Sequence, residues 1–453
     1  MKAGDGSALR ALPPDFVWGA ATSSYQIEGA ASRDGRGESI WDRFCRAPGR
    51  IRDGTSGDVA CDFYSRFRDD IALMRRLGLD AYRFSIAWPR VVPEGRGRVN
   101  QRGLDFYDRL LDELLGANIA PYPTLYHWDL PQPLQDRGGW ARRATAEAFA
   151  EYVDVVAARL GDRVQHWTTH NEPFCASWLG YGLGVHAPGH VDRREALAAA
   201  HHVLLSHGWA VDVLRRAVPQ ARVGIVVDSW PIYPYSSSPA DEQAARLVDG
   251  MRNRWYFDAL FKGAYPADML GYYGDDVPPI RDGDLSTIAT PIDFVGANNY
   301  SRQFVRADVN GGFPTDVRPA TGNLTALGWE VYPDGLAELL TRLHREYGVR
   351  KLLVTENGAA YADVRTHDGA IHDVERIDYL ASYIDAVASA VAAGVPVGGY
   401  FVWSLLDNFE WAEGYSKRFG LVYVDYPTLE RIPKDSFFWY RDLIGRRKLA
   451  EAA

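Results

Sequence analysis

The strongest constraint on the fold of this 453-residue chain is a regular alternation of strand-like and helical segments. Short runs rich in β-branched and aromatic residues alternate with longer runs of helical periodicity, and no low-complexity linker interrupts them. Such an alternation with right-handed crossovers closes most naturally into an eight-stranded parallel barrel. The predicted strands are Phe16–Ala21, Ala81–Ile86, Ala120–Tyr126, Val164–Thr169, Arg222–Val227, Phe294–Asn298, Lys351–Thr355 and Gly398–Trp403.

The length suits one α/β domain, a (β/α)8 TIM barrel with long loops over the C-terminal face, spanning residues 1–453 with peripheral ends at 1–13 and 446–453. Two irregular segments, Gly180–Asp192 and Arg302–Trp329, are rich in Gly, Pro and Asn and each follows a strand end, so we expect them to be those loops. The predicted helices are Tyr64–Leu77, Gly103–Leu115, Ala144–Leu160, Arg194–Arg216, Ala240–Phe261, Gly335–Tyr347 and Arg376–Ala393.

Charge and composition exclude several classes of protein. The formal net charge is −9 and Lys and Arg form no cluster, so we expect no nucleic acid partner. No run of 18 apolar residues exists, and residues 1–14 lack an apolar signal core, so we expect a cytoplasmic protein without membrane contact. Cys45, Cys61 and Cys175 have neither zinc spacing nor an even count, which also favours a reducing compartment.

Two glutamates follow predicted strands in unusual surroundings. Glu172 lies in Thr-His-Asn-Glu-Pro after the fourth strand, and Glu356 lies in Thr-Glu-Asn-Gly after the seventh. The carboxyl ends of parallel strands meet at one mouth of a barrel, so the two acids predict paired-carboxylate chemistry. The alternative is a pair of strand-end turns with solvated acids, and either motif alone leaves both interpretations open.

Polar and aromatic residues stand at the ends of seven of the eight predicted strands. This set comprises Gln26, Arg83, His127, Trp128, Asn171, Glu172, Asn298, Tyr300, Glu356, Trp403, Glu410 and Trp411. It suits hydrolysis of a sugar acetal, in which one carboxylic acid protonates the leaving oxygen and a carboxylate attacks the anomeric carbon. Amide, imidazole and indole groups suit sugar hydroxyls and ring faces. Taken singly, His127 fits a satisfied core histidine better than a ligand.

Seven runs of residues carry a specific resemblance. They are Phe16–Thr22, Tyr25–Gly29, Tyr82–Trp88, His127–Pro131, Asn171–Pro173, Thr355–Gly358 and Trp403–Trp411. In this order they resemble glycoside hydrolase family 1, the retaining β-glucosidases, from about Pro14 to Arg441. The resemblance implies hydrolysis of terminal non-reducing β-D-glucosyl residues from cello-oligosaccharides and from aryl or alkyl β-glucosides, and hence a role in cellulose degradation.

The resemblance also implies roles for the acids. Glu356 would be the nucleophile, kept ionised by Arg83 and Tyr300, and Glu172 the general acid and then base, its pKa raised by the charge of Glu356. Retaining geometry predicts carboxyl groups about 5 Å apart. Asn171 would bind the sugar 2-hydroxyl.

Further site residues are implied by the same resemblance. The innermost sugar would contact Gln26, His127, Trp403, Glu410 and Trp411, and further substrate-binding residues would be Trp128, Asn298 and Tyr300. Trp329 would be a platform for the leaving group or simply a loop-packing tryptophan, and Phe174 and Cys175 would line the same outer subsite. Glucose, galactose and fucose remain alternatives for the preferred sugar.

Two positions depart from the family pattern. His170 stands where an apolar residue is usual, so its ring would either perturb Asn171 or pack behind it. Asn299 stands where the family often has the first of two tyrosines, which leaves Tyr300 as the match to the second. A register error of one residue would misassign the tyrosine beside Glu356.

The alternatives are a 6-phospho-β-glucosidase of the same family and a non-catalytic sugar-binding protein. Phospho-enzymes of the family place a small hydroxyl residue at the position of Glu410 and a tyrosine at that of Phe419, and a carboxylate at 410 would repel phosphate. The presence of both catalytic carboxylates disfavours a binding protein. A homo-oligomer is as compatible with the sequence as a monomer.

We expect neither a cofactor nor a metal ion. The glycine run at 180–184 lacks the strand-turn-helix setting of a nucleotide loop. His186 and His190 have helical metal spacing, but Pro188 intervenes and would break such a helix.

Overall fold

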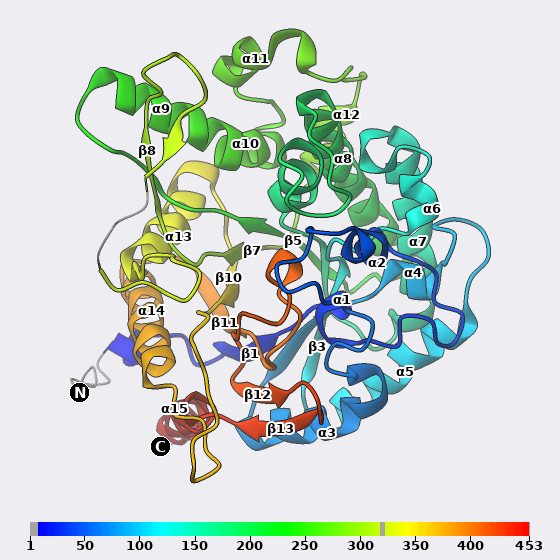
Figure 1. The fold of residues 1–453 in the computed structure, drawn as a ribbon, viewed down its shortest axis with the longest axis vertical. Coiled ribbons are helices and arrows are strands. Elements are labelled where there is room, and N and C mark those ends of the chain that lie inside the picture. The colour runs from blue at the N-terminus through cyan, green and yellow to red at the C-terminus, as the bar shows by residue number, and fades with distance from the viewer. Residues whose placement is uncertain (1–7, 318–321, 453) are drawn as a thin grey trace.

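Eight parallel strands close into a barrel in the computed structural model, which describes residues 8–317 and 322–452 (Figure 1). Each strand pairs with the next barrel strand along the chain, and the last pairs with the first, from Val17 beside Gly399 to Ala21 beside Trp403. The strands are β1 (Val17–Ala21), β2 (Ala81–Ser85), β3 (Ala120–Tyr126), β4 (His166–Asn171), β5 (Arg222–Asp228), β7 (Phe294–Asn298), β10 (Leu352–Asn357) and β11 (Val397–Trp403). The predicted barrel is confirmed.

Three strands extend further than the sequence predicted. β4 ends at Asn171, β5 at Asp228 and β10 at Asn357, so Glu356 lies within its strand rather than after it. The side chain of Asn357 donates to Asn299 O at 2.7 Å and accepts from the Tyr400 hydroxyl at 2.6 Å. These contacts hold the strand end in place, and a register shift just before Glu356 redirects the side chains there.

Long helices surround the barrel (Figure 1). None of the described helices is long and apolar enough to cross a membrane. The long connecting helices are α3 (Phe63–Leu77), α5 (Gln101–Gly116), α7 (Arg143–Leu160), α8 (Arg193–Ala217), α13 (Pro333–Tyr347) and α14 (Val374–Ala392), and α15 (Asp435–Ala452) follows the last barrel strand. Six of the seven predicted helices match these with small shifts at their ends.

The seventh predicted helix, Ala240–Phe261, is not one regular helix. It consists of α9 (Pro239–Asp249), the π-helical turn η4 (Gly250–Arg254) and α10 (Trp255–Lys262). A Cβ atom on Gly250 would lie 2.2 Å from the Met269 sulfur, so a larger residue at this turn would displace the Met269 side chain. Helical periodicity alone gave no signal for the π turn, because the apolar spacing continues through it.

Short elements fill the connections. The segment Arg302–Trp329 contains β8 (Gln303–Arg306) and β9 (Thr315–Asp316), which form a small sheet with β6 (Ile232–Pro234). The hairpin of β12 (Val422–Asp425) and β13 (Glu430–Pro433) lies beside α15. The other short elements are α1 (Ser24–Ile27), α2 (Ile40–Arg46), α4 (Trp88–Val91), α6 (Gln132–Gln135), α11 (Ala267–Tyr273), α12 (Asp284–Ile288), the 3₁₀ turns Ala8–Ala11, Gly139–Ala141, Gly274–Asp276 and Trp411–Glu413, and the π-helical turn η3 (Cys175–Gly182).

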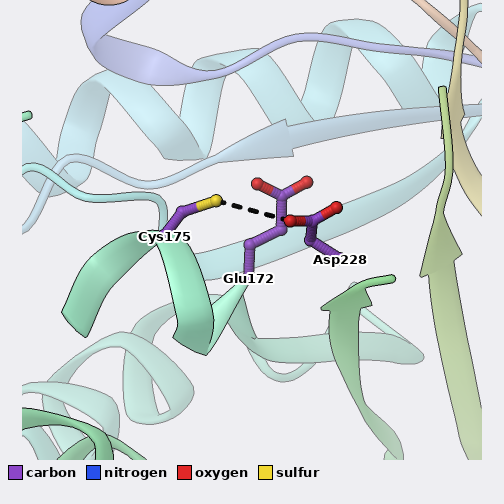
Figure 2. A group of neighbouring side chains, drawn as sticks. All are labelled: Glu172, Cys175 and Asp228. Atoms are coloured by element: carbon purple, nitrogen blue, oxygen red, sulfur yellow. Dashed lines mark hydrogen bonds between the residues drawn. The ribbon is translucent and has the colours of Figure 1, made fainter. Parts of the chain in front are cut away.

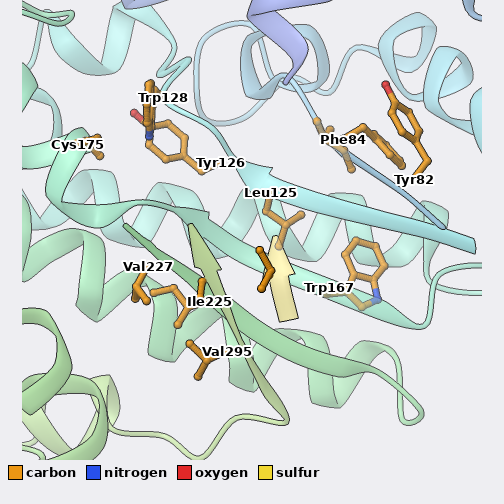
Figure 3. Close-up of a cluster of buried hydrophobic side chains, with 14 of the residues drawn as sticks. Tyr82, Phe84, Leu125, Tyr126, Trp128, Trp167, Cys175, Ile225, Val227 and Val295 are labelled. Atoms are coloured by element: carbon orange, nitrogen blue, oxygen red, sulfur yellow. The ribbon is translucent and has the colours of Figure 1, made fainter. Parts of the chain in front are cut away.

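Alternate residues of the barrel strands form two apolar layers. The outward layer packs against the helices, as Tyr82 does against Phe63 with ring centres 6.2 Å apart, and Figure 3 shows Tyr82 with other residues of the same buried cluster, including Trp128 and Cys175 beyond the strand ends. The inward layer includes Tyr122 and Phe401, whose rings lie 5.2 Å apart although β3 and β11 are not adjacent strands. This contact therefore crosses the barrel. Tyr122, Phe401 and the apolar side chains packed around them form an apolar plug, which closes the barrel interior below the polar strand ends.

A buried ion network fixes the loop that follows β11. Lys434 Nζ, fully buried, contacts Asp407 Oδ1 at 2.7 Å and Asp363 Oδ2 at 2.5 Å. Arg418 also contacts Asp407, at 2.7 Å, and Arg376 contacts Asp363, at 2.7 Å. The network joins three segments of the chain at the start of the loop that carries Glu410 and Trp411.

We expect Lys434→Met to lower the free energy of unfolding by about 3 kcal/mol, because two buried carboxylates lose a shared cation. Urea unfolding followed by circular dichroism measures the change. Lys262→Met is the matched control: its partner Asp258 lies one helical turn away at the surface, and exposed pairs contribute about 0.5 kcal/mol or less. Equal losses in the two variants would contradict a structural role for the network.

Candidate active site

A pocket of about 720 Å³ opens at the carboxyl ends of the barrel strands. Glu172 and Glu356, only 5% and 3% exposed, lie in its wall, which excludes solvated strand-end turns. Eight more of the predicted residues line it: His127, Trp128, Tyr300, Trp329, Trp403, Glu410, Trp411 and Phe419. The remaining four, Gln26, Arg83, Asn171 and Asn298, are buried behind this lining and hydrogen-bond to it.

Both carboxylate oxygens of Glu356 have strong donors. Arg83 Nη1 donates to Oε1 at 2.5 Å, and the Tyr300 hydroxyl donates to Oε2 at 2.7 Å. Burial raises the pKa of Glu356, and the Arg83 guanidinium and the Tyr300 hydroxyl oppose that rise by stabilising the ionised form. The neighbouring Asn299 side chain donates to Ser229 O and Ser301 O instead, so the tyrosine at Glu356 is Tyr300 as the sequence predicted.

Glu172 has a different environment. Asn298 Nδ2 donates to its Oε1 at 2.7 Å, and among the described residues no cation forms an ion pair with it. Burial raises the pKa of Glu172 well above its ordinary value, and the negative charges of Asp228 and Glu356 raise it further. Its backbone φ of 51° lies in the left-handed region, a strained conformation for a side chain of this size.

The network behind the two acids fixes the protonation of His127. Asn171 Oδ1 accepts from Arg83 at 2.7 Å and from Asn298 at 3.1 Å, so its Nδ2 must be the donor to His127 Nε2 at 3.2 Å. Burial and the nearby Arg83 charge hold the pKa of His127 well below its ordinary value. The ring is therefore neutral with its proton on Nδ1, which has no partner among the described residues.

Another part of the pocket wall consists of Glu410 and the indole rings of Trp403 and Trp411. Gln26 Nε2 donates to Phe409 O at 2.9 Å and reaches Glu410 Oε2 at 3.4 Å. Burial, followed by the charges of Glu356 and Glu413, raises the pKa of Glu410 to about 8.

Two tryptophans of the pocket share the backbone strain seen at Glu172. Trp128 and Trp411 have φ values of 76° and 50°, and their rings pack with centres 4.7 Å apart. Three left-handed non-glycine residues in one pocket indicate that the surrounding packing holds this wall in place.

The structure settles how His170 packs and places Trp329 in the pocket, while the leaving-group role of Trp329 stays a prediction. His170 Nε2 contacts Ser206 Oγ at 2.8 Å and its ring lies 4.4 Å from that of Phe149, so it packs behind the site. Trp329 is half-buried, lies 5.5 Å from the Tyr300 ring and lines the pocket, so it is both a loop-packing and a pocket residue.

Sequence reasoning missed one side of the pocket. Asp228 and Arg252 line it, together with Arg52, Gln303 and Lys417. Asp228 ends β5, the one barrel strand to which no site residue was assigned, and its position after a β-branched run was a signal comparable to that of Glu172. Arg252 had no such signal, because it lies in the unpredicted π turn. Cys175 lines the pocket as predicted, whereas Phe174 lies beneath Arg252, with 4.7 Å from the guanidinium carbon to its ring centre.

Comparison with known proteins identifies the family of this chain. Residues 9–449 match the model of glycosyl hydrolase family 1. The chain belongs to this family. A beta-glucosidase A from Acetivibrio thermocellus is 49% identical over 441 residues, covering 96% of this chain and 98% of that protein. A 1,4-beta-D-glucan glucohydrolase from Thermotoga neapolitana is 47% identical over 446 residues, covering 98% of this chain and all of that protein.

Solved structures of family 1 agree with this fold. A beta-glucosidase from Thermotoga maritima in complex with glucoimidazole superimposes with a TM-score of 0.94 at 47% identity, covering 96% of this chain and 99% of that one. Family 1 membership therefore makes the protein a glycosidase, and the two buried acids stand in the motifs by which the sequence resembled the family.

The raised pKa of Glu410 predicts a pH-dependent stability for this family 1 enzyme. Between its ordinary pKa of 4.5 and its folded value of about 8, the folded state holds the proton more tightly. Stability therefore falls as pH rises through this window. Glu410→Gln removes the effect, and we expect the variant to gain stability over the unsubstituted protein, by on the order of 2 kcal/mol between pH 5 and 8.

Urea unfolding at several pH values measures this gain. Glu413→Gln is the control, because its carboxylate pairs with Arg52 at 2.9 Å on the pocket rim; we expect no comparable rise. A Glu410→Gln difference that stays constant across the window would contradict the assignment.

Proposed function

We propose that this family 1 enzyme is a retaining β-glucosidase that forms a covalent glycosyl-enzyme on Glu356. The observation that carries the proposal is the contrast between two buried carboxylates of one pocket. Glu356 contacts the Arg83 guanidinium, whereas Glu172 contacts a neutral amide and lies near other negative charges. The names of the relatives, β-glucosidase and glucan glucohydrolase, support the same activity.

In the first step, a Glu356 oxygen attacks the anomeric carbon as the glycosidic bond breaks, and Glu172 gives its proton to the leaving oxygen. Glu356 is then an ester, and its charge no longer raises the pKa of Glu172. In the second step, Glu172 removes a proton from water, the hydroxide oxygen attacks the anomeric carbon, and Glu356 leaves as a carboxylate. This route carries the prediction of carboxyl groups about 5 Å apart.

The polar network would supply the contacts to the innermost glucose. Asn171 would bind the 2-hydroxyl, and the Nδ1 proton of His127 would be donated to a neighbouring hydroxyl. Gln26 and Glu410 would bind the hydroxyls at the far edge of the ring. The indoles of Trp403 and Trp411 would cover its apolar face.

The substrate class and the compartment are further parts of the proposal. The pocket volume of about 720 Å³ exceeds what one sugar fills, which supports cello-oligosaccharides as well as aryl and alkyl β-glucosides, and a role in cellulose degradation. Cys45, Cys61 and Cys175 are free thiols, which supports a reducing compartment such as the cytoplasm.

A substrate panel tests the activity. We expect release of nitrophenol from the β-D-glucoside, less from the β-D-galactoside, and at least 100-fold less from the 6-phosphoglucoside. Glu413 would repel the phosphate, the Glu410 carboxyl group offers it no positive charge, and Lys417 donates to the Ala326 carbonyl instead of serving as a free phosphate ligand. Preference for the 6-phosphate would overturn the proposal in favour of a phospho-β-glucosidase, and inactivity on all three would favour a sugar-binding protein.

The role of Glu172 predicts a dependence on the leaving group. For Glu172→Ala, we expect kcat/KM on cellobiose to fall about 10³-fold or more, and to fall far less on 2,4-dinitrophenyl β-glucoside, whose departure needs no proton. Glu356→Gly is the control, because loss of the nucleophile should abolish turnover of both substrates. Equal losses on both substrates in Glu172→Ala would exclude the acid role.

A further inference from the structure

A third carboxylate lies beside Glu172. Asp228 ends β5 opposite Glu172 and Cys175, as Figure 2 shows, and one ligand atom of each lies within 4.8 Å of the others. Cys175 Sγ donates to Asp228 Oδ2 at 3.7 Å. Arg252 Nη2 donates to the same Asp228 oxygen at 2.6 Å. The spacing of the three groups would suit a metal ion, but the guanidinium already neutralises Asp228 and would repel a second cation.

Arg252 is held rigidly. It comes from the π-helical turn η4, and its guanidinium carbon lies 4.7 Å from the Phe174 ring centre and 4.8 Å from that of Trp230. Two cation–π contacts and the ion pair restrict the movement of the guanidinium. Its ion pair with Asp228 is therefore a fixed part of the pocket wall, and both residues line the pocket beside Glu172.

Two adjacent buried carboxylates share protons unequally. Burial raises the pKa of both acids, and each negative charge opposes ionisation of the other. The cation decides which of them ionises: Arg252 contacts Asp228, whereas the partners of Glu172 among the described residues are neutral, the Asn298 amide and the Cys175 thiol. The proton of the pair therefore belongs on Glu172.

The other charged and titratable groups near Glu172 are consistent with this assignment. They are Cys175 on η3, Asp228 on β5, Arg252 on η4, Tyr300 after β7, Glu356 on β10 and, behind Glu356, Arg83 on β2. Arg83 is committed to Glu356 and Arg252 to Asp228, so each of the two cations compensates a carboxylate other than Glu172.

We propose that Asp228, ion-paired to Arg252, is a positioning residue that keeps Glu172 protonated until the leaving group departs. The inference rests on the proposed β-glucosidase mechanism and adds a second source of negative charge to it. The charge of Glu356 disappears when the glycosyl-enzyme forms, but the charge of Asp228 persists through both steps. Asp228 therefore favours the acid role of Glu172 and opposes its later conversion to a base.

Asp228→Asn tests the proposal through the pH dependence of kcat/KM for cellobiose. We expect the alkaline limb, which reports loss of the Glu172 proton, to move about one pH unit lower. Loss of the Asp228 charge and the now unpaired Arg252 cation act in the same direction. Asp228→Glu, which retains the charge, should restore the limb toward its original position. Asp228→Ser removes the same charge and serves as a second variant if the asparagine variant does not fold.

Two controls separate this effect from a structural one. The alkaline limb for 2,4-dinitrophenyl β-glucoside should not move, because that leaving group needs no proton. Asp258→Asn removes a carboxylate that pairs with Lys262 outside the pocket, and should leave the cellobiose profile unchanged. An unmoved limb for cellobiose in Asp228→Asn, or equal shifts with both substrates, overturns the inference alone. Inactivity of the unsubstituted protein on every β-glucoside overturns the proposed function and this inference with it.

Discussion

The polar end of the barrel depends on one buried cation. Arg83 is 1% exposed and contacts Glu356 with one nitrogen and Asn171 with another. Asn171 in turn orients His127 and accepts from Asn298, which donates to Glu172. A guanidinium without these acceptors could not stay in the barrel interior. The Arg83 guanidinium therefore lies at the centre of one hydrogen-bonded network that links residues of four strands, β2, β4, β7 and β10.

Two cations, Arg83 and Arg252, determine which of four carboxyl groups in the pocket are ionised. Glu356 and Asp228 each contact a guanidinium, whereas the donors to Glu172 and Glu410 within the described part of the chain are neutral. Burial alone would raise the pKa of all four, so the positions of Arg83 and Arg252 provide the distinction between them. Acid and nucleophile can therefore differ in charge state although both are glutamates at the ends of barrel strands.

Strand periodicity and local motifs were enough to predict the barrel and most of its polar mouth. Eight strands and the residues at seven of their ends were found because most of these side chains stand close to the end of a strand and the others, such as Gln26 and Glu410, lie in recognisable motifs. Asp228 carried the same signal and was overlooked, whereas Arg252 lies in a π turn that has no periodic signature. β8 and β9 lie in a segment that was predicted as a loop, because these strands are short and their partner β6 is distant in the sequence. The predicted set of charged residues around Glu172 was therefore incomplete. It lacked the Asp228–Arg252 pair, because Asp228 was overlooked and Arg252 comes from a segment that was assigned to a regular helix.

The barrel strands and the segments inserted between them contribute different residues to the pocket. Glu172 and Glu356, with Asn171 and Asn298, lie at strand ends that are held by the barrel register and by the apolar plug beneath them. Trp329 and Arg252, which also line the pocket, belong to inserted segments instead. The Asp228–Arg252 pair is where these two regions meet: one residue ends a barrel strand and the other lies in η4. A change of packing in η4 would therefore reach the proton on Glu172 through charge, without any displacement of the barrel.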